Sequence, residues 1–91
     1  NDAEAVKWFR KAADQGNAAA QFNLGYMYAT GEGVPENNIR AYGWWSMAKT
    51  QGNTTAAGNL DILKSMMTPQ QIADGQALAA KCYESGYKDC D

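Results

Sequence analysis

Two cysteines, Cys82 and Cys90, are the side chains of this 91-residue sequence with the widest choice of chemistry. Two thiols can bind zinc, cycle between thiol and disulfide, attack a substrate or form a lasting crosslink. Structural zinc normally takes four ligands, and a redox-active pair normally has the spacing Cys-x-x-Cys. The chain contains no histidine, so no imidazole is present to complete a metal site or to activate a thiolate or a serine. We therefore expect no metal, no cofactor and no enzyme activity.

Gly31 and Gly33 are the second candidate, because glycine-rich loops can bind phosphate. The segment is too short for such a loop and follows a predicted helix, whereas phosphate-binding loops follow a strand. We interpret it as a turn that uses positive φ angles. The 8 basic and 10 acidic residues are scattered and give a net charge of −2, which argues against nucleic-acid binding. No apolar stretch approaches the roughly 20 residues of a membrane span, so we expect no membrane insertion.

Five helical segments must position these residues, because apolar side chains recur at helical spacing five times along the chain. Asparagines precede two of the segments as predicted N-caps, and Thr68, Pro69 and Gln71 form a predicted capping box. No segment alternates with period two, so we expect no sheet. The helices are residues 2–15, a segment from Asn17 to Gly31, a segment from Asn37 to Gly52, a segment through Ala56 and Met67, and a segment from Thr68 to about Ser85.

An internal repeat relates the first four segments. Nine residues recur after 36 positions, and a fixed period of this length is typical of repeat arrays. We predict an all-α fold, an α/α solenoid of antiparallel helix hairpins with about two and a half repeats. The predicted divisions are repeat one at 1–36, repeat two at 37–68, and a C-terminal capping helix and tail at 69–91. The recurring residues are Ala5, Trp8, Ala12, Gln15, Gly16, Asn17, Ala20, Asn23 and Leu24, which return as Ala41, Trp44, Ala48, Gln51, Gly52, Asn53, Ala56, Asn59 and Leu60.

Residue sizes within the repeat predict how the helices pack. Small residues recur where the two helices of a hairpin cross, at Ala12, Ala20, Ala48 and Ala56. We expect larger residues to fill the space between layers, at Trp8, Trp44, Leu24 and Leu60. Trp44 and Trp45 are adjacent, and two adjacent side chains point to different sides of a helix. We therefore expect one of them to be partly exposed.

The first repeat carries a motif specific enough to resemble a known family. Its pattern runs from Ala5 and Trp8 through Gln15-Gly16-Asn17 and Leu24-Gly25-x-Met27-Tyr28 to Gly31-x-Gly33-Val34-Pro35. It is similar to the Sel1-like repeat (SLR), a longer-period relative of the tetratricopeptide repeat. The second repeat fits as far as Leu60 and then departs, with Asp61 where the first has Gly25. The resemblance implies a solenoid with a concave face, in proteins that serve as adaptors and scaffolds.

The repeat register also places the cysteines. Aligning Gly86 with Gly16 puts Cys82 on Ala12 and Cys90 on Ala20, the two crossing alanines. Close backbones at a crossing suit the Cα separation that a disulfide requires. We therefore predict a Cys82–Cys90 disulfide, in a third repeat that ends just after its second helix begins. Similar cysteine pairs occur in bacterial members of the family that the chain resembles.

A disulfide indicates an oxidising compartment, so we expect a periplasmic or secreted protein. Asn1 aligns with Asn37, directly after the position of a Gly-x-Gly-Val-Pro loop. We therefore expect the chain to be the C-terminal part of a longer bacterial array.

The predicted function is a non-catalytic protein-interaction or scaffold module with a protein or peptide partner. Aromatic residues dominate interface energetics, which makes Tyr42, Trp45 and Tyr83 the candidate contacts. One alternative is a purely structural C-terminal cap, whose polar outer face would include Lys81, Glu84, Lys88 and Asp89. Another alternative is a cell-wall or β-lactam hydrolase, since some cysteine-rich members of the family that the chain resembles have been linked to penicillin binding or hydrolysis. The chain supplies no nucleophile with a base for such a reaction.

Overall fold

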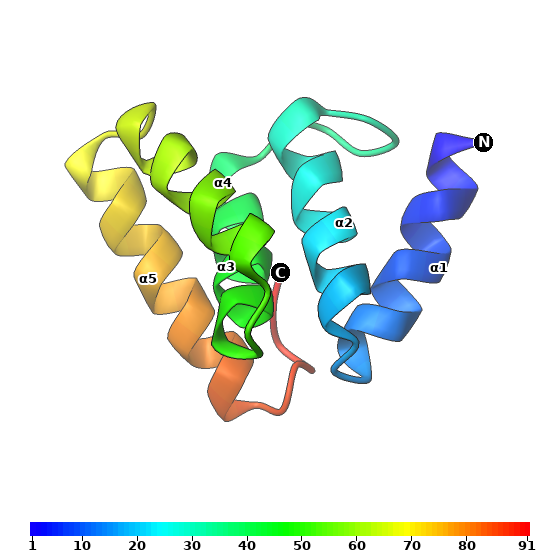
Figure 1. Ribbon diagram of the computed structural model, residues 1–91. Coiled ribbons are helices and arrows are strands. Elements are labelled where there is room, and N and C mark those ends of the chain that lie inside the picture. Colours follow the sequence, from blue (N-terminus) through cyan, green and yellow to red (C-terminus); the bar gives the residue numbers. More distant parts are fainter.

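A computed structural model describes residues 1–91 and contains five α-helices and no strand (Figure 1). This arrangement confirms the predicted all-α solenoid, and each helix lies where the apolar spacing predicts it. The helices are α1 (Asp2–Asp14), α2 (Ala18–Thr30), α3 (Asn38–Thr50), α4 (Thr54–Ser65) and α5 (Pro69–Glu84).

Each helix begins at a side chain that caps it. The first four helices start after an asparagine whose Oδ1 accepts a backbone N–H of the first turn, at Asn1, Asn17, Asn37 and Asn53. The fifth starts with the predicted capping box, in which Thr68 and Gln71 exchange hydrogen bonds at 3.1 and 2.9 Å. Such caps satisfy N–H groups that have no partner within the helix. The helix starts are thus set locally, by residues that the sequence displays.

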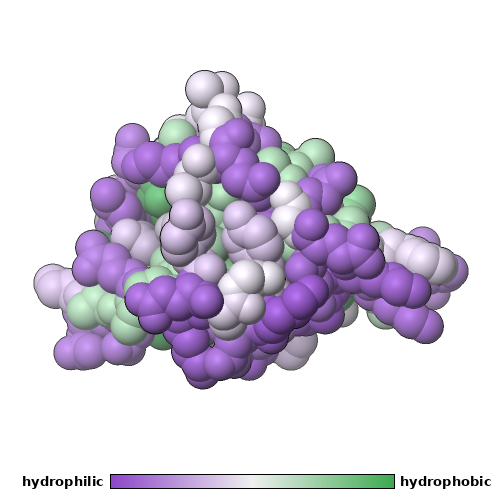
Figure 2. All heavy atoms as spheres, turned by 90° about the horizontal axis from the view of Figure 1, so that it is seen from below, coloured by the Kyte–Doolittle hydropathy of each residue, from purple (hydrophilic) through white to green (hydrophobic).

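Helix α3 is the centre of the molecule. It packs against α2, α4 and α5, whereas α1 packs against α2 (Figure 1). The core contains the predicted recurring residues Ala20, Leu24, Ala48, Ala56 and Leu60, all of which are buried. The lower end of the molecule carries the α1–α2 and α3–α4 turns, and its surface is dominated by hydrophilic residues (Figure 2). A hydrophilic surface over a continuous stripe of recurring buried residues is typical of a repeat array.

Both adjacent tryptophans are buried, so the prediction that one would be partly exposed is wrong. Trp44 has no exposed surface and Trp45 is 5% exposed. The reason is that neighbouring helices cover α3 from different sides. Trp45 packs on Gly25 of α2 and Tyr42 packs on Gly75 of α5, where a Cβ would come within 2.5 and 2.7 Å of the rings. Two glycines therefore create the space that lets both sides of α3 be apolar.

Trp8 occupies the same repeat position as Trp44, yet 59% of it is exposed. The prediction that it fills the space between layers is therefore wrong in this structure. Helix α1 packs against α2 but has no helix on its other side, whereas α3 has neighbours on both. The Lys11 ammonium lies 5.6 Å from the centre of the Trp8 ring. The same residue type is thus core or surface according to the number of neighbours its helix has.

The chain beyond Gly86 forms turns and no helix, which corrects the prediction that a second helix of a third repeat begins there. The Ser85 hydroxyl accepts the N–H groups of Lys88 and Asp89 at 3.2 and 2.9 Å. Tyr87 has a left-handed φ of 69°. Side-chain hydrogen bonds of this kind compete with a helix for the backbone N–H groups. Residues 85–91, the tail, instead return from α5 toward α1 and α3 (Figure 1).

Candidate functional site

An apolar groove lies between α2 and α4, with α3 beneath it. Its volume is about 270 Å³, and six of its eight lining residues are hydrophobic. Three of these project far into solvent: Tyr26 is 45% exposed, Ile62 is 62% exposed and Met66 is 65% exposed. Scattered apolar residues are ordinary on a protein surface, but three around one hollow form a candidate binding surface.

Trp45 lines the groove from α3 and is held firmly. Its Nε1–H donates to the Phe22 carbonyl oxygen at 2.9 Å. The Phe22 and Trp45 rings are stacked, with centroids 6.2 Å apart. Gly25 leaves room for the indole against α2. The groove is thus lined by a tightly held indole and by the exposed Met66, a residue type whose unbranched side chain can adjust to different apolar groups.

The structure separates the three aromatic residues that the sequence nominated as partner contacts. Trp45 lines the groove, although little of its surface is open. Tyr42 is 7% exposed and its ring packs against Gly75, so little of its surface is open to a partner. Tyr83 is 59% exposed on α5 and does not line the groove. Their role in binding stays a prediction.

Sequence reasoning missed the exposed rim of the groove. Tyr26, Ile62 and Met66 lie outside the helical stripe formed by buried residues such as Leu24, Leu60 and Leu63. The sequence signal that could have revealed them is an apolar residue outside the buried stripe of its helix. Such a position is more often polar when its side chain neither packs in the core nor contacts a partner. This signal does not predict that Tyr26 lies in the same groove as Ile62 and Met66, which are 36 and 40 positions away in the sequence.

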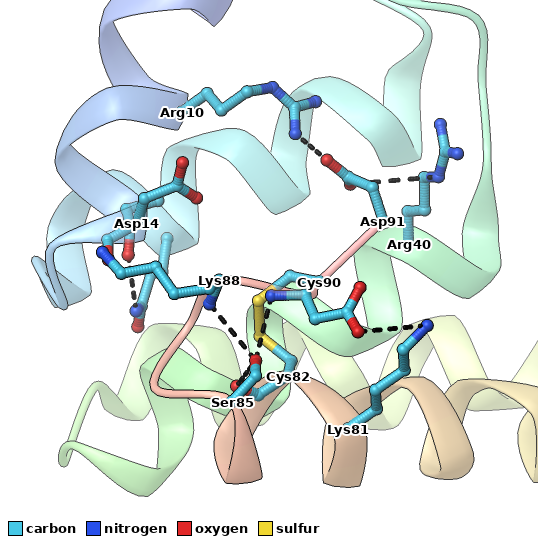
Figure 3. Close-up of a disulfide and its surroundings, with 12 residues drawn as sticks. Arg10, Asp14, Arg40, Lys81, Cys82, Ser85, Lys88, Cys90 and Asp91 are labelled. Atoms are coloured by element: carbon cyan, nitrogen blue, oxygen red, sulfur yellow. Dashed lines mark hydrogen bonds and ion pairs between the residues drawn. A yellow bond between two sulfur atoms is a disulfide. The ribbon is translucent and has the colours of Figure 1, made fainter.

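Cys82 and Cys90 form a disulfide in the structure, with their Cα atoms 4.3 Å apart (Figure 3). Both are buried, and neither presents a free thiol. Further contacts fix the tail around this bond: Lys81 pairs with Asp89 at 3.4 Å, and the Lys88 ammonium donates to the Asp14 carbonyl oxygen at 3.1 Å. The tail therefore connects the last helix to the first hairpin.

The remaining ionisable residues form no centre suited to metal chemistry. No group of three or more aspartate, glutamate, cysteine and histidine side chains is placed to bind a metal ion. None of the helices combines the length and apolar content needed to span a membrane. The groove and the surface under the tail each bring together side chains from several helices.

Comparison with known families identifies the repeat. The model of the Sel1 repeat matches residues 1–17 and 18–53. The chain belongs to the Sel1 repeat family. The matched unit at 18–53 begins half a repeat later than the predicted repeat at 1–36. The predicted repeat boundaries at 1–36 and 37–68 therefore stay a prediction.

Relatives of this Sel1 repeat chain include regulators. It is 35% identical over 80 residues to "Chitin synthase regulator SKT5" of Malassezia restricta, covering 87% of this chain and 6% of the relative. It is 41% identical over 49 residues to "Exopolysaccharide production negative regulator" of Rhizobium meliloti, covering 54% of this chain and 18% of the relative. The matched segments thus cover less than a fifth of the length of these curated relatives.

A solved structure supports the fold assignment. A protective antigen of uropathogenic Escherichia coli, c5321, which displays an SLR fold, superposes with a TM-score of 0.89 and 30% identity. The alignment covers 96% of this chain and 20% of that protein. The two chains therefore share the solenoid over almost all of the residues described here.

Proposed function

We propose that this chain is a non-catalytic protein-interaction module within a regulatory or scaffold protein, and that its partner binds in the α2–α4 groove. The observation that carries the proposal is the cluster of Tyr26, Ile62 and Met66, exposed around the Trp45 wall. Sel1 repeats generally serve protein interaction, and the fungal and bacterial relatives are named as regulators. Those names support a regulatory role without indicating what this chain regulates.

The size of the groove favours a protein partner over a small molecule. Its volume of about 270 Å³ lies at or below the lower end of the roughly 300–1,000 Å³ typical of small-molecule sites. A hollow of this size accommodates one or two apolar side chains from another protein. Burying each such side chain contributes about 1.5–3 kcal/mol, before the costs of association are subtracted.

The disulfide supports a further part of the proposal, which concerns location. A Cys82–Cys90 bond persists in an oxidising compartment and is rare in a reducing one. We therefore propose a periplasmic or secreted protein.

Site-specific photocrosslinking in cells that express the protein tests the groove. A photoreactive benzoylphenylalanine at Ile62 is expected to form an adduct with a discrete protein, while one at the exposed Ala77 of α5 serves as the matched control. Met66→Asp should reduce the Ile62 adduct, because it places a charge beside the apolar hollow. Equal adducts at Ile62 and Ala77, or an Ile62 adduct unchanged by Met66→Asp, would exclude the groove as the binding site.

A second candidate role, as a structural cap, is favoured by the tail. Residues 85–91 connect α5 to α1 through the disulfide, Lys88 and Asp91. A module with only a structural role should form no specific adduct from Ile62. Removal of the disulfide should lower stability in either role, so crosslinking from Ile62 is the measurement that separates them.

A further inference from the structure

Both arginines of the chain converge on one carboxylate. The sequence contains Arg10 and Arg40 and no other arginine. Arg10 forms an ion pair with the side chain of Asp91, and the Arg40 Nε lies 3.9 Å from Asp91 Oδ1 (Figure 3). The Tyr28 hydroxyl donates to the same Oδ1 at 3.4 Å. One side chain from each of α1, α2 and α3 therefore contributes to a single carboxylate-binding site.

The two arginines of this carboxylate site do not recur in the repeat. At the equivalent positions, 36 residues away, Arg10 is replaced by Ser46, and Arg40 by Glu4. Tyr28 is likewise replaced by Lys64. Tyr28 belongs to the motif of the first repeat and is buried in the core, whereas the two arginines lie outside the recurring set. Residues that break a repeat pattern at one converging position are candidates for recognition.

The arginines are organised by contacts that do not depend on Asp91. Arg10 donates to the Tyr28 hydroxyl. The two guanidinium carbons lie 5.8 and 5.7 Å from the centre of the Tyr28 ring, within range of cation–π attraction. Tyr28 itself is 2% exposed, so packing holds its ring in place. Without Asp91, the site would present two oriented guanidinium groups that have no other carboxylate partner.

Asp91 reaches the site as a tethered group. It directly follows Cys90, whose disulfide fixes the tail to α5. The side chains of Arg10, Arg40 and Asp91 are each 30–41% exposed, so water and dissolved ligands can reach the ion pairs. Exposed ion pairs add little to folding stability and are readily exchanged. Tethering, by contrast, gives Asp91 a high effective concentration at the arginines.

We propose that Arg10, Tyr28 and Arg40 bind aspartate or glutamate side chains in an acidic segment of a partner protein, and that Asp91 occupies this site as an intramolecular competitor. Charge complementarity identifies the ligand, because guanidinium groups in a fixed arrangement favour carboxylates. The inference rests on the proposed role in protein interaction, but it uses a different surface. Tyr26 and Tyr28 are two residues apart, and such positions lie on nearly opposite sides of a helix.

Nuclear magnetic resonance can follow the site directly, because the two arginine Nε–H groups are its only signals of that kind. The probe is the peptide acetyl-Gly-Asp-Asp-Gly-amide, whose capped ends leave only side-chain carboxylates. In the Asp91→Asn variant it should shift both signals saturably, with a Kd at least about ten-fold lower than in the unmodified chain, because the tethered competitor is removed. The corresponding Asn-Asn peptide should cause no saturable shift.

Two further variants make the test specific. Asp89→Asn removes a tail carboxylate that pairs with Lys81, so it should leave the peptide Kd unchanged. Arg10→Gln added to Asp91→Asn should abolish saturable binding at the Arg40 signal. The proposal is overturned if Asp91→Asn binds no better than the unmodified chain, if the Asn-Asn peptide binds equally well, or if Arg10→Gln has no effect. None of these results bears on crosslinking from Ile62, so the groove and the carboxylate site can fail separately.

Discussion

The two helical glycines Gly25 and Gly58 allow the packing of α3 to be tested by one kind of substitution. Both lie inside helices and neither has a positive φ. A Cβ on Gly25 would lie 2.5 Å from Cδ1 and 2.7 Å from Nε1 of Trp45. A Cβ on Gly58 would meet no atom within 4 Å. Replacing each by alanine therefore separates helix propensity, which both share, from the contact with Trp45.

The expected changes follow from three contributions. Alanine in place of glycine stabilises a helix by about 0.8–1 kcal/mol at either position. At Gly25 the indole must move toward an ordinary carbon contact of about 3.5–4.0 Å, and overpacking of this kind costs about 1–3 kcal/mol. Moving the indole also disturbs its hydrogen bond to Phe22, a loss of about 1 kcal/mol. Gly25→Ala should therefore destabilise the protein by about 1–3 kcal/mol, and Gly58→Ala should stabilise it by up to about 1 kcal/mol.

Urea unfolding, followed by far-ultraviolet circular dichroism, measures both free energies. Thermal unfolding should agree, since 1 kcal/mol corresponds to about 4–8 °C in a domain of this size. A double-mutant cycle isolates the contact: in a Trp45→Ala background, Gly25→Ala should become neutral or stabilising. If Gly25→Ala were as stable as Gly58→Ala, or equally destabilising with and without Trp45, the account of how α3 is buried on both sides would be refuted.

Three other predictions concern the core, the disulfide and the caps. Trp44→Ala should destabilise by about 3–5 kcal/mol and Trp8→Ala by less than about 1 kcal/mol, because Trp44 is wholly buried and Trp8 is 59% exposed. Equal losses in urea unfolding would contradict this difference in burial. Reducing the Cys82–Cys90 disulfide should lower the free energy of unfolding by up to about 2.5 kcal/mol, by the chain-entropy argument. The stability of the Cys82→Ser, Cys90→Ser double variant should not change with reductant. Unchanged stability of the original protein on reduction would show that the bond does not stabilise the fold. Thr68→Ala should lower stability by about 1 kcal/mol through loss of the capping box, whereas Thr55→Ala, at an exposed site within the first turn of α4, should change the melting temperature little.

The helices and their limits could be predicted because their causes are local. The asparagine caps, the Thr68 capping box and the helical spacing of apolar residues act within a few positions of the chain. The 36-residue repeat added the solenoid, since identical hairpins stack in the same way. The register of Gly86 with Gly16 also pointed to the pairing of Cys82 and Cys90 that the structure contains.

Exposure could not be predicted from the repeat, because it depends on neighbours that the repeat does not specify. Trp8 and Trp44 share a register position, yet only the helix that carries Trp44 has neighbours on both sides. Trp45 is buried because Gly25, 20 positions earlier, leaves room for its ring. Asp61 can stand where the first repeat has Gly25 because α4 does not pack closely on α5, and its side chain is 75% exposed.

The sequence by itself therefore determined the helices, their hairpin arrangement and the family, since these depend on short-range capping and on a periodic pattern. The tertiary structure alone decided which surfaces are available for recognition. Tyr26 and Met66 share a groove, and Arg10 and Arg40 meet at Asp91, only because the solenoid brings separate helices together. The physical reason is that packing free energy is roughly proportional to apolar area and does not depend on which polar or rim residues accompany it. Residues at the rim are thus free to vary without changing the fold, and their positions in space define the sites.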